Sequence, residues 1–349
     1  MTSQLQKSCP QQNRPFEPFC HSPPEPYSVG VCARGWSEAA DGGCQTDSKS
    51  SIFLRAGLLQ LALIHWLYCL LLPFALLAVP APQFREPQAP FVSGDGFRSY
   101  ADYVYDELDV TLDPKSVKPS GVIFVRSSLL REFFEQVHPS IPNKYILISH
   151  NSDDNVPGPY ASYLDDPKLI AWFTINYDGT KHPKIHPIPI GIANLCLPNG
   201  NTKTITKVRE LKLPKEHLAY MNLTIQTCYP ERWPVFQQFA KEPFCYRTMK
   251  KVFEGYLKEV ASSQFIIAPR GVGFDTYRLW EALYIGTIPI VKSSPLDSLY
   301  AELPILIVKD WKLVTEEFLQ KKQLEMSQAQ HSLEKLDMAY WIKQIESYK

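Results

Sequence analysis

The chain has 349 residues, 45% of them hydrophobic and 21% charged, and its 36 basic residues balance its 36 acidic ones. This length allows two domains with appendages, and the composition is that of ordinary globular proteins. The zero net charge, without any basic stripe, argues against nucleic acid as a partner, because binding along a phosphate backbone needs a surplus of Lys and Arg.

Residues 1–55 are rich in Pro, Ser, Gly, Cys and Gln and contain few aliphatic side chains. Such a segment cannot bury enough apolar surface to offset the entropy of ordering the chain, so we predict a disordered tail. Its four cysteines lack the close paired spacing of a zinc site, and no metal site is expected there. They are Cys9, Cys20, Cys32 and Cys44.

Residues 56–79, AGLLQLALIHWLYCLLLPFALLAV, contain no Asp, Glu, Lys or Arg. A helix of this length, rising about 1.5 Å per residue, crosses the roughly 30 Å of a bilayer's hydrocarbon core. A buried core helix and a cleaved signal peptide are the alternatives, but the run is apolar all round and starts far from the N-terminus. Lys49 and Arg55 precede the run, and the positive-inside rule then favours a cytosolic tail. We expect one transmembrane signal-anchor and a type II orientation.

Residues 80–115 are expected to form a stem, because the prolines at its start favour an extended, stiff chain. The acceptor triplet for N-glycosylation that begins at Asn222 gives modest support to a luminal location for the residues after the stem. In an oxidising lumen, two of the three later cysteines could form a disulfide while one stays free, and spacing does not decide which two. These cysteines are Cys196, Cys228 and Cys245.

Strands and helices alternate from Gly121 onward. A strand at 122–125, a helix at 127–137 and a strand at 145–149 form one βαβ unit, which predicts a Rossmann-like N-terminal half over residues 116–245. The pattern continues with apolar runs at 169–175 and 188–192 and with helices at about 230–241 and 247–262.

The stretch from Gln264 to Lys292 is predicted to be a strand, a glycine loop, a helix and a second strand, which together make one right-handed crossover. Asp275 is expected to cap the helix at its N-terminus and Gly286 to end it. A strand at 305–308 and helices from Thr315 would complete a C-terminal half over residues 246–349. Tyr340, Trp341 and Ile345 are available to pack back across the domains.

In such a unit an anion binds where the first strand ends and the helix begins, because free backbone N–H groups and the helix dipole face it. Gly271 and Gly273 allow close approach to a phosphate, and Arg270 adds a positive charge. Glu281 lies among apolar residues, where a carboxylate needs hydrogen bonds such as those of a ribose. The alternative is a surface pair between Arg278 and Glu281, and the loop lacks the third glycine of the dinucleotide fingerprint.

The segment from Phe265 to Trp311 resembles the exostosin-like glycosyltransferases of the GT47 type, with a Pro-Arg-Gly loop, then DTYRLWEAL from Asp275 and GTIPIV from Gly286. The region before about Tyr246 resembles the family only loosely. The resemblance implies a compact α/β fold of two Rossmann-like halves, called GT-B, preceded here by the single transmembrane helix. It also implies that the loop and helix bind a nucleoside diphosphate sugar through residues that include Arg270, Arg278 and Glu281.

Polar residues follow the strand at 145–149 and would face the crevice between the halves. An inverting transfer needs a base for the acceptor's proton, and the candidates are His150, Asp153 and Asp154. A plain Asx-rich turn is an equal alternative. We expect no metal ion to be required, although the pairs Asp153-Asp154 and Asp165-Asp166 suit divalent cations, because arginines and a helix dipole can stabilise a departing diphosphate.

Two further features receive structural interpretations. His182 and His186 supply only two ligands and are expected in a rigid loop. Arg232 has two interpretations, a position that reaches the crevice between the halves and a surface salt bridge, and the salt bridge is favoured.

The sequence therefore predicts a membrane-anchored glycosyltransferase of the Golgi or ER, with a luminal catalytic part. It would transfer a sugar from a nucleotide-sugar donor, a UDP-sugar by expectation, to a hydroxyl of a glycan or glycoprotein acceptor. The alternatives are a fucosyltransferase-type enzyme with a GDP donor, and an inactive lectin-like or scaffolding protein of the same fold. A dinucleotide oxidoreductase ranks last, because the fingerprint is incomplete.

Overall fold

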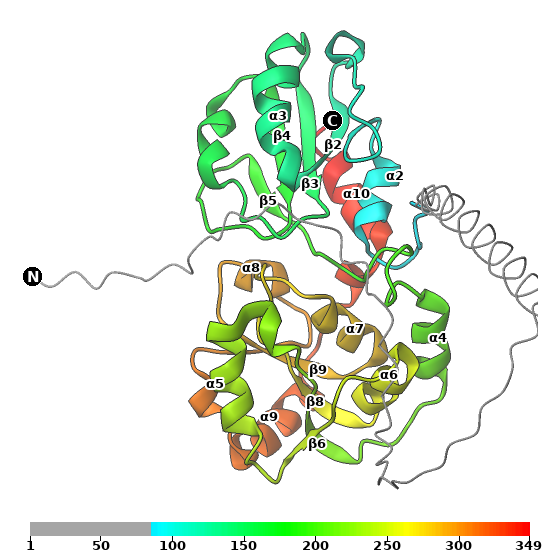
Figure 1. The fold of residues 1–349 in the computed structure, drawn as a ribbon, viewed down its shortest axis with the longest axis vertical. Helices are drawn as coiled ribbons and strands as arrows, with labels where there is room; N and C mark the ends of the chain where they lie inside the picture. Colours follow the sequence, from blue (N-terminus) through cyan, green and yellow to red (C-terminus); the bar gives the residue numbers. More distant parts are fainter. Residues whose placement is uncertain (1–84) are drawn as a thin grey trace, which may run out of the picture. The chain divides into compact units, whose positions relative to one another are not determined.

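The computed structural model describes residues 85–349, which lie in one compact unit that begins at Val79. They form two five-stranded sheets in which every paired strand is parallel to its neighbour (Figure 1). The predicted tail and the predicted membrane-spanning segment at 56–79 lie outside the described residues. No helix within residues 85–349 is long and apolar enough to cross a membrane.

The first sheet follows chain order, β1-β2-β3-β4-β5. Its central strands are apolar and buried along their length, because helices or turns cover both faces, as is usual for parallel sheets. The predicted strand at 188–192 is absent and β5 ends at Pro187, since Pro187 and Pro189 lack the N–H groups that a longer strand would need. The strands are β1 Tyr103–Tyr105, β2 Gly121–Arg126, β3 Tyr145–His150, β4 Leu169–Thr174 and β5 Ile185–Pro187.

The second sheet has the order β10-β9-β8-β6-β7. The chain runs from β6 outward to the edge strand β7, then crosses back to β8 and continues through β9 to β10. Neighbouring strands β6 and β8 therefore send their connections in opposite directions, which makes the gap between them a topological switch point. The strands are β6 His217–Met221, β7 Cys245–Arg247, β8 Ser263–Ile267, β9 Ile288–Lys292 and β10 Leu306–Val308.

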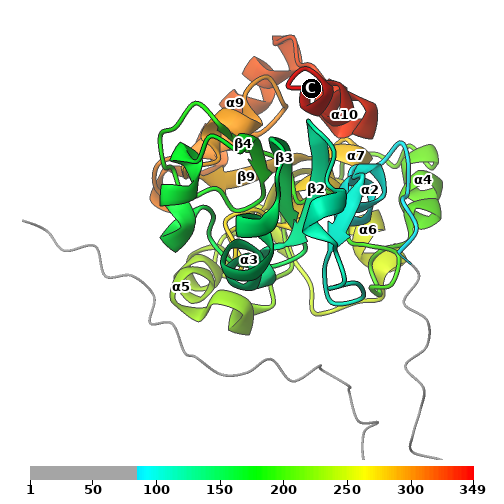
Figure 2. The same ribbon diagram turned by 90° about the horizontal axis from the view of Figure 1, so that it is seen from above.

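Helices cover both faces of the second sheet. On one face α4, α6 and α7 pack against one another, while α5 and α9 lie on the other side (Figure 2). Gly286 ends α7 in the left-handed conformation with φ 81°, as predicted. The helices are α4 Thr202–Glu210, α5 Tyr229–Phe239, α6 Phe253–Ala261, α7 Tyr277–Ile285, α8 Asp297–Tyr300 and α9 Glu316–Gln328.

Shorter turns connect these elements. The predicted helix at 127–137 is present as a series of short helical pieces, in which Phe133–Val137 is wound more loosely than an α-helix. The pieces are η2 Ser127–Leu129, α3 Leu130–Glu132, η3 Phe133–Val137 and η4 His138–Ser140. The remaining turns are η1 Pro114–Ser116, η5 Gly158–Asp165, η6 Ile225–Cys228, η7 Trp311–Leu313 and η8 Glu334–Leu336.

The boundaries of the halves differ from those predicted. Strand β6 falls within the expected N-terminal half, 116–245, and β7 begins at the last residue of that range, but both strands pair in the second sheet. The expected stem, 80–115, contains helix α2 Gly94–Tyr100 and strand β1 of the first sheet. Both differences have one cause: these elements are short, and their places are set by pairing with strands distant in sequence, which local periodicity does not reveal.

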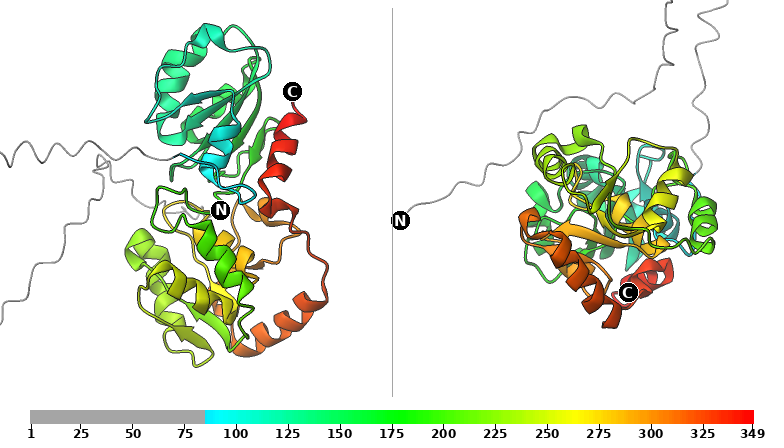
Figure 3. Two further views of the ribbon diagram at one scale, coloured as in Figure 1. Left: turned by 90° about the vertical axis from the view of Figure 1, so that its right-hand side faces the viewer. Right: turned by 90° about the horizontal axis from the view of Figure 1, so that it is seen from below.

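The C-terminal helix α10, Met338–Glu346, returns to the first sheet (Figure 3). The N–H of Met338 donates to the carbonyl of Pro90 at 2.9 Å. Trp341 and Ile345 are buried in the same core as Phe97, and Tyr340 packs against it, which confirms the prediction that this segment packs across the domains. One apolar core therefore continues between the two sheets.

Candidate functional site

A cavity of about 420 Å³ lies at the switch point of the second sheet. Its walls come from the loops that follow β6 and β8, from the start of α7, and from the segment that leads into α6. The first half contributes Asp153, Ile190 and Asn199. A larger hollow of about 570 Å³ lies at the other end of β6 and β7 and contains none of the residues predicted for function. The topology therefore places the predicted site at the smaller cavity.

The glycine loop, 269–274, approaches the first half closely. A Cβ atom on Gly273 would lie 2.5 Å from Oδ1 of Asn176, whereas one on Gly271 would be no closer than 3.4 Å to any neighbour. Asn176 in turn accepts the N–H of Asp275 at 3.3 Å and donates to the carbonyl of Ser152 at 3.2 Å. Gly273 is thus required by contact between the halves, while Gly271 lines the cavity with room beside it.

Asp275 is not the N-cap that was predicted. Thr276 occupies the N-cap position of α7 and makes no side-chain capping bond. The buried carboxylate of Asp275 instead accepts the N–H of Ile190 at 2.8 Å, the Nε1–H of Trp280 at 2.8 Å and the hydroxyl of Tyr300 at 3.2 Å. Burial raises its pKa to about 6, and these donors oppose the rise. Asp275 therefore ties the two halves together, because Ile190 of the first half donates to the same carboxylate as Trp280 of α7 and Tyr300.

Glu281 is buried, with 3% of its surface exposed, and lines the cavity. Within the described part of the chain, its Oε1 and the hydroxyl of Tyr256 have no hydrogen-bond partner, and both residues line this cavity. Burial raises the pKa of Glu281 to about 7, although the charge of Arg278 and the nearby hydroxyl of Tyr256 oppose the rise. The local physics that predicted a carboxylate in need of a ligand agrees with this environment.

The expected alternative, a surface pair between Arg278 and Glu281, does not form in residues 85–349. The guanidinium of Arg278 donates from Nη2 to the carbonyl of Asn222 at 2.6 Å, and its Nε is buried without a partner. Arg270 bends back over its own loop, donates to the carbonyls of Gly271 and Val272, and stacks on Phe274 with 4.2 Å to the ring centre. Arg278 therefore lines the cavity, and Arg270 does not.

Arg232 differs from its prediction as a surface salt bridge. Its side chain, on α5, is buried with 5% of its surface exposed and lines the cavity. It donates to the carbonyl of Arg270 at 2.8 Å and to that of Thr224 at 2.9 Å, and so joins the loops that follow β8 and β6. Burial lowers its pKa to about 10, and the charge of Arg278 adds to this shift. The favoured interpretation, a surface salt bridge, is therefore wrong, and the alternative, a position at the crevice, agrees with the structure. Carbonyl partners leave no charge pattern in the sequence, so the sequence could not decide between the two.

Asn222, which begins the predicted glycosylation triplet, lines the cavity at the end of β6. Its Nδ2 donates to the hydroxyls of Tyr220 and Thr248 at 3.1 and 3.2 Å and to the carbonyl of Met249 at 3.0 Å. The nitrogen that would carry a glycan is therefore hydrogen-bonded to neighbouring residues, on a half-buried side chain.

The thiols of Cys196, Cys228 and Cys245 are free, so the disulfide that two of them could form is absent from the structure.

The three candidate bases are separated by the fold. His150 is buried, its Nδ1 accepts the N–H of Asn151 at 2.7 Å, and burial lowers its pKa to about 4. Asp154 accepts the hydroxyl of Ser152 at 2.7 Å and does not line the cavity. Asp153 lines the cavity. Its carboxyl is accessible to solvent, yet the surrounding wall desolvates it and, with the charge of Asp154, raises its pKa.

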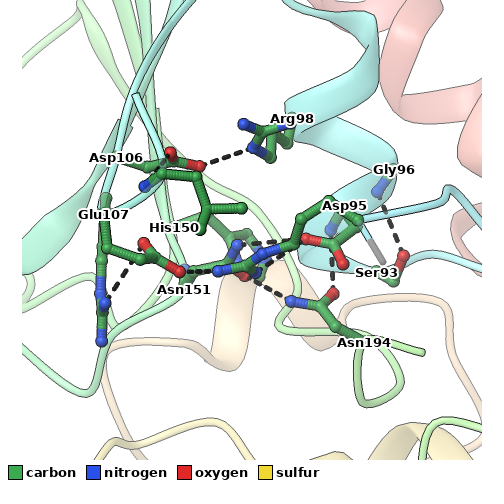
Figure 4. Close-up of polar contacts among 12 residues, drawn as sticks. Ser93, Asp95, Gly96, Arg98, Asp106, Glu107, His150, Asn151 and Asn194 are labelled. Atoms are coloured by element: carbon green, nitrogen blue, oxygen red, sulfur yellow. Dashed lines mark hydrogen bonds and ion pairs between the residues drawn. The ribbon is translucent and has the colours of Figure 1, made fainter. Parts of the chain in front are cut away.

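A second polar cluster lies where β1, β2 and β3 end, and its members hold one another (Figure 4). Asp95 on α2 accepts Arg85 at 3.1 Å, and its N–H donates to Oδ1 of Asn194 at 2.9 Å. Asn194 also donates to Oδ1 of Asn151 at 3.1 Å. Charged pairs between Arg98 and Asp106, 2.6 Å apart, and between Arg126 and Glu107, 3.2 Å apart, complete the cluster. The bond from Asn194 holds Asn151, which lies two residues before Asp153.

The histidines and acidic residues do not gather into a metal centre. Among residues 85–349, no group of three or more His, Cys, Asp or Glu side chains is arranged to hold a metal ion. His182 lies 3.5 Å from Asp165, and His186 packs against Phe173 and Tyr348, so both histidines have structural neighbours.

Comparison with known proteins gives one family match. Residues 238–348 match the family described as the RXYLT1 C-terminal domain. The solved structures that match the chain include two with low sequence identity. The "OtsA apo structure" has a TM-score of 0.40 and 11% identity over 67% of this chain and 74% of that chain. The pneumococcal O-GlcNAc transferase GtfA in complex with UDP and GlcNAc has a TM-score of 0.31 and 12% identity over 66% and 54%.

These two scores are too low for any argument about the site, and no curated protein matches the chain. The family match includes β8, the glycine loop and α7, which carry Arg278 and Glu281. Residues 238–348 are therefore similar to the RXYLT1 C-terminal domain, and the same region carries the sequence resemblance to exostosin-like glycosyltransferases.

Proposed function

We propose that the protein is a glycosyltransferase that binds a nucleoside diphosphate sugar at the switch point of its second sheet. The observation that carries this proposal is the buried, unpartnered carboxylate oxygen of Glu281 beside Arg278 in a cavity that the glycine loop borders. A buried carboxylate without donors is costly, and the two hydroxyls of a ribose supply the donors that it lacks.

The donor's diphosphate would bind on the same side of the cavity as the ribose. The backbone of the glycine loop and the N-terminus of α7 favour an anion, and Arg278 presents a guanidinium beside them. Uridine diphosphate is the nucleotide that we assign, following the expectation from the sequence. A GDP donor is the alternative, because the ribose and diphosphate contacts do not distinguish the two bases.

Asp153 is the residue that we assign as base. It is the one candidate base that lines the cavity, and it does so from the first half, opposite Arg278 and Glu281. The acceptor oxygen would attack the anomeric carbon while its proton passes to Asp153, and the bond from that carbon to the diphosphate oxygen would break. Attack from the side opposite the leaving group inverts the configuration. The positive wall would stabilise the departing diphosphate without a metal ion.

We also propose that residues 56–79 anchor the protein in the membrane of the Golgi or ER, with the catalytic part luminal and a hydroxyl of a glycan or glycoprotein as acceptor. The apolar, uncharged character of this segment supports the anchor. An inactive lectin-like or scaffolding protein of the same fold is the alternative, and it predicts no turnover of any donor.

Thermal unfolding of the part from Pro82 onward tests the donor site. A ligand that binds only the folded chain raises the midpoint by mass action, so UDP should stabilise the wild type, and Arg278→Ala and Glu281→Ala should remove the shift. Arg131→Ala is the matched control, since Arg131 is exposed and pairs with Glu135 at 3.1 Å. A shift from GDP and not UDP would favour the alternative donor. No shift from any nucleotide, or equal shifts in all variants, would refute the assigned site.

A further inference from the structure

Arg232 is a buried cation without an acidic neighbour. In the described part of the chain no carboxylate lies within 4.0 Å of its guanidinium. Its identified acceptors are backbone carbonyls, those of Arg270, Thr224 and, at 3.5 Å, Pro269. A guanidinium has five N–H donors, so these three contacts leave two free on a side chain that lines the cavity.

Arg232 shares its cavity with a second cation. Arg278 also lines the cavity, and its charge lowers the pKa of Arg232 further than burial alone. Each also donates to a carbonyl of the loop after β6, Arg278 to Asn222 and Arg232 to Thr224. Like charges brought together out of water repel each other, so this wall is stabilised by an anion with at least two charges.

Glu281 alone does not supply that negative charge. Its single carboxylate interacts with Arg278, and it cannot neutralise two guanidinium groups. Gly271 lines the same cavity, and Nη2 of Arg232 lies 3.4 Å from the position that a Cβ atom of residue 271 would take. A larger side chain at residue 271 would therefore crowd the Arg232 guanidinium beside the proposed diphosphate site.

We infer that Arg232 is the second cation of the diphosphate site and binds the terminal phosphate of the donor's diphosphate together with Arg278. The inference rests on the proposed donor site. As the sugar's anomeric carbon leaves the terminal phosphate oxygen, the diphosphate gains a negative charge, and the paired guanidinium groups stabilise it. The same side chain ties the loops after β6 and β8 together, so donor binding also fixes the geometry of the switch point.

Calorimetric titration of UDP and UMP against the wild type, Arg232→Gln and Arg232→Lys tests this role. Loss of a charged hydrogen-bond donor should weaken UDP about 10- to 100-fold and UMP far less, so that the ratio of the two affinities collapses in Arg232→Gln. Arg232→Lys keeps the charge and should retain part of that ratio. Arg247→Gln is the matched control, because Arg247 is also bound to a backbone carbonyl, that of Ala240, but lies outside the cavity.

The outcomes separate the two proposals. An equal weakening of UDP and UMP in Arg232→Gln would show that the side chain only holds the loops, and would overturn the inference. If Arg232→Gln does not fold, Arg232→Lys decides. An Arg232→Lys protein that binds UDP as tightly as the wild type, with the same ratio of UDP to UMP affinity, would also overturn the inference. A wild type that binds neither nucleotide would refute the donor site itself.

Discussion

Replacing Glu281 with Gln should stabilise the empty protein at pH 8. Burial raises the folded-state pKa of Glu281 from 4.5 to about 7. Between these values the folded state holds more protons than the unfolded state, so stability is lost as pH rises through this window and the loss is complete above it. At about 1.36 kcal/mol per unit, the ionised carboxylate costs the empty fold about 3 kcal/mol, and Gln removes that cost.

Urea unfolding of both proteins at pH 5 and pH 8 measures this effect. The stability advantage of Glu281→Gln should widen by about 2 to 3 kcal/mol from pH 5 to pH 8. Glu259→Gln is the control, and its expected effect has the opposite sign. Burial favours the protonated form of Glu259 too, but hydrogen bonds from Lys251, Tyr220 and Thr248 lower its pKa overall. Replacing the Glu259 carboxylate should therefore destabilise the protein at neutral pH. A Glu281→Gln advantage that is equal at both pH values, or absent at pH 8, would refute the reasoning.

Three further predictions concern the neighbouring residues. Asp153→Asn should reduce turnover about 10²- to 10⁴-fold while Asp154→Asn changes it little, measured as initial rates with the identified donor; equal effects would contradict the assignment of the base. Thr224→Ala removes the glycosylation triplet and keeps Asn222, so expression through the secretory pathway should give the same electrophoretic mobility as the wild type, and a faster band would show that Asn222 carries a glycan. Gly273→Ala drives a Cβ atom into a neighbouring amide and should lower the unfolding midpoint, whereas an unchanged midpoint would show that the halves can separate there.

The crossover unit from β8 to β9 was predictable because its signals are local. A short apolar run, a glycine loop, an apolar helix and Gly286 succeed one another within one stretch, and the structure places all of them as expected. Glu281 was predictable for the same reason, because its apolar neighbours surround it in sequence as well as in space. Local patterns therefore identified the centre of the candidate site.

The features that the sequence did not reveal depend on contacts between distant segments. Asp275 has the sequence position of an N-cap, but Ile190 and Tyr300 donate to its oxygens from outside its helix. Arg232 pairs with carbonyls that any residue could offer, so no side-chain pattern marks it. Strand β6 takes its place beside β8 through long-range pairing, and only that pairing creates the switch point.

Two buried carboxylates, Asp275 just before α7 and Glu281 within it, differ in whether the protein itself satisfies their hydrogen bonds. Asp275 and Glu281 both have raised pKa values because of burial. Ile190, Trp280 and Tyr300 donate hydrogen bonds to Asp275, whereas Glu281 lines a cavity and has an oxygen that lacks a partner in the described residues. A satisfied buried charge holds elements together, while an unsatisfied one costs stability that only a ligand can return. Arg232 also lines this cavity, and its three carbonyl acceptors leave two of its N–H donors without an identified partner in the described residues. Charged groups of both signs at one switch point therefore lack partners. This favours a ligand that places hydroxyls beside Glu281 and a diphosphate beside the arginines, and it argues against a purely structural role for these residues.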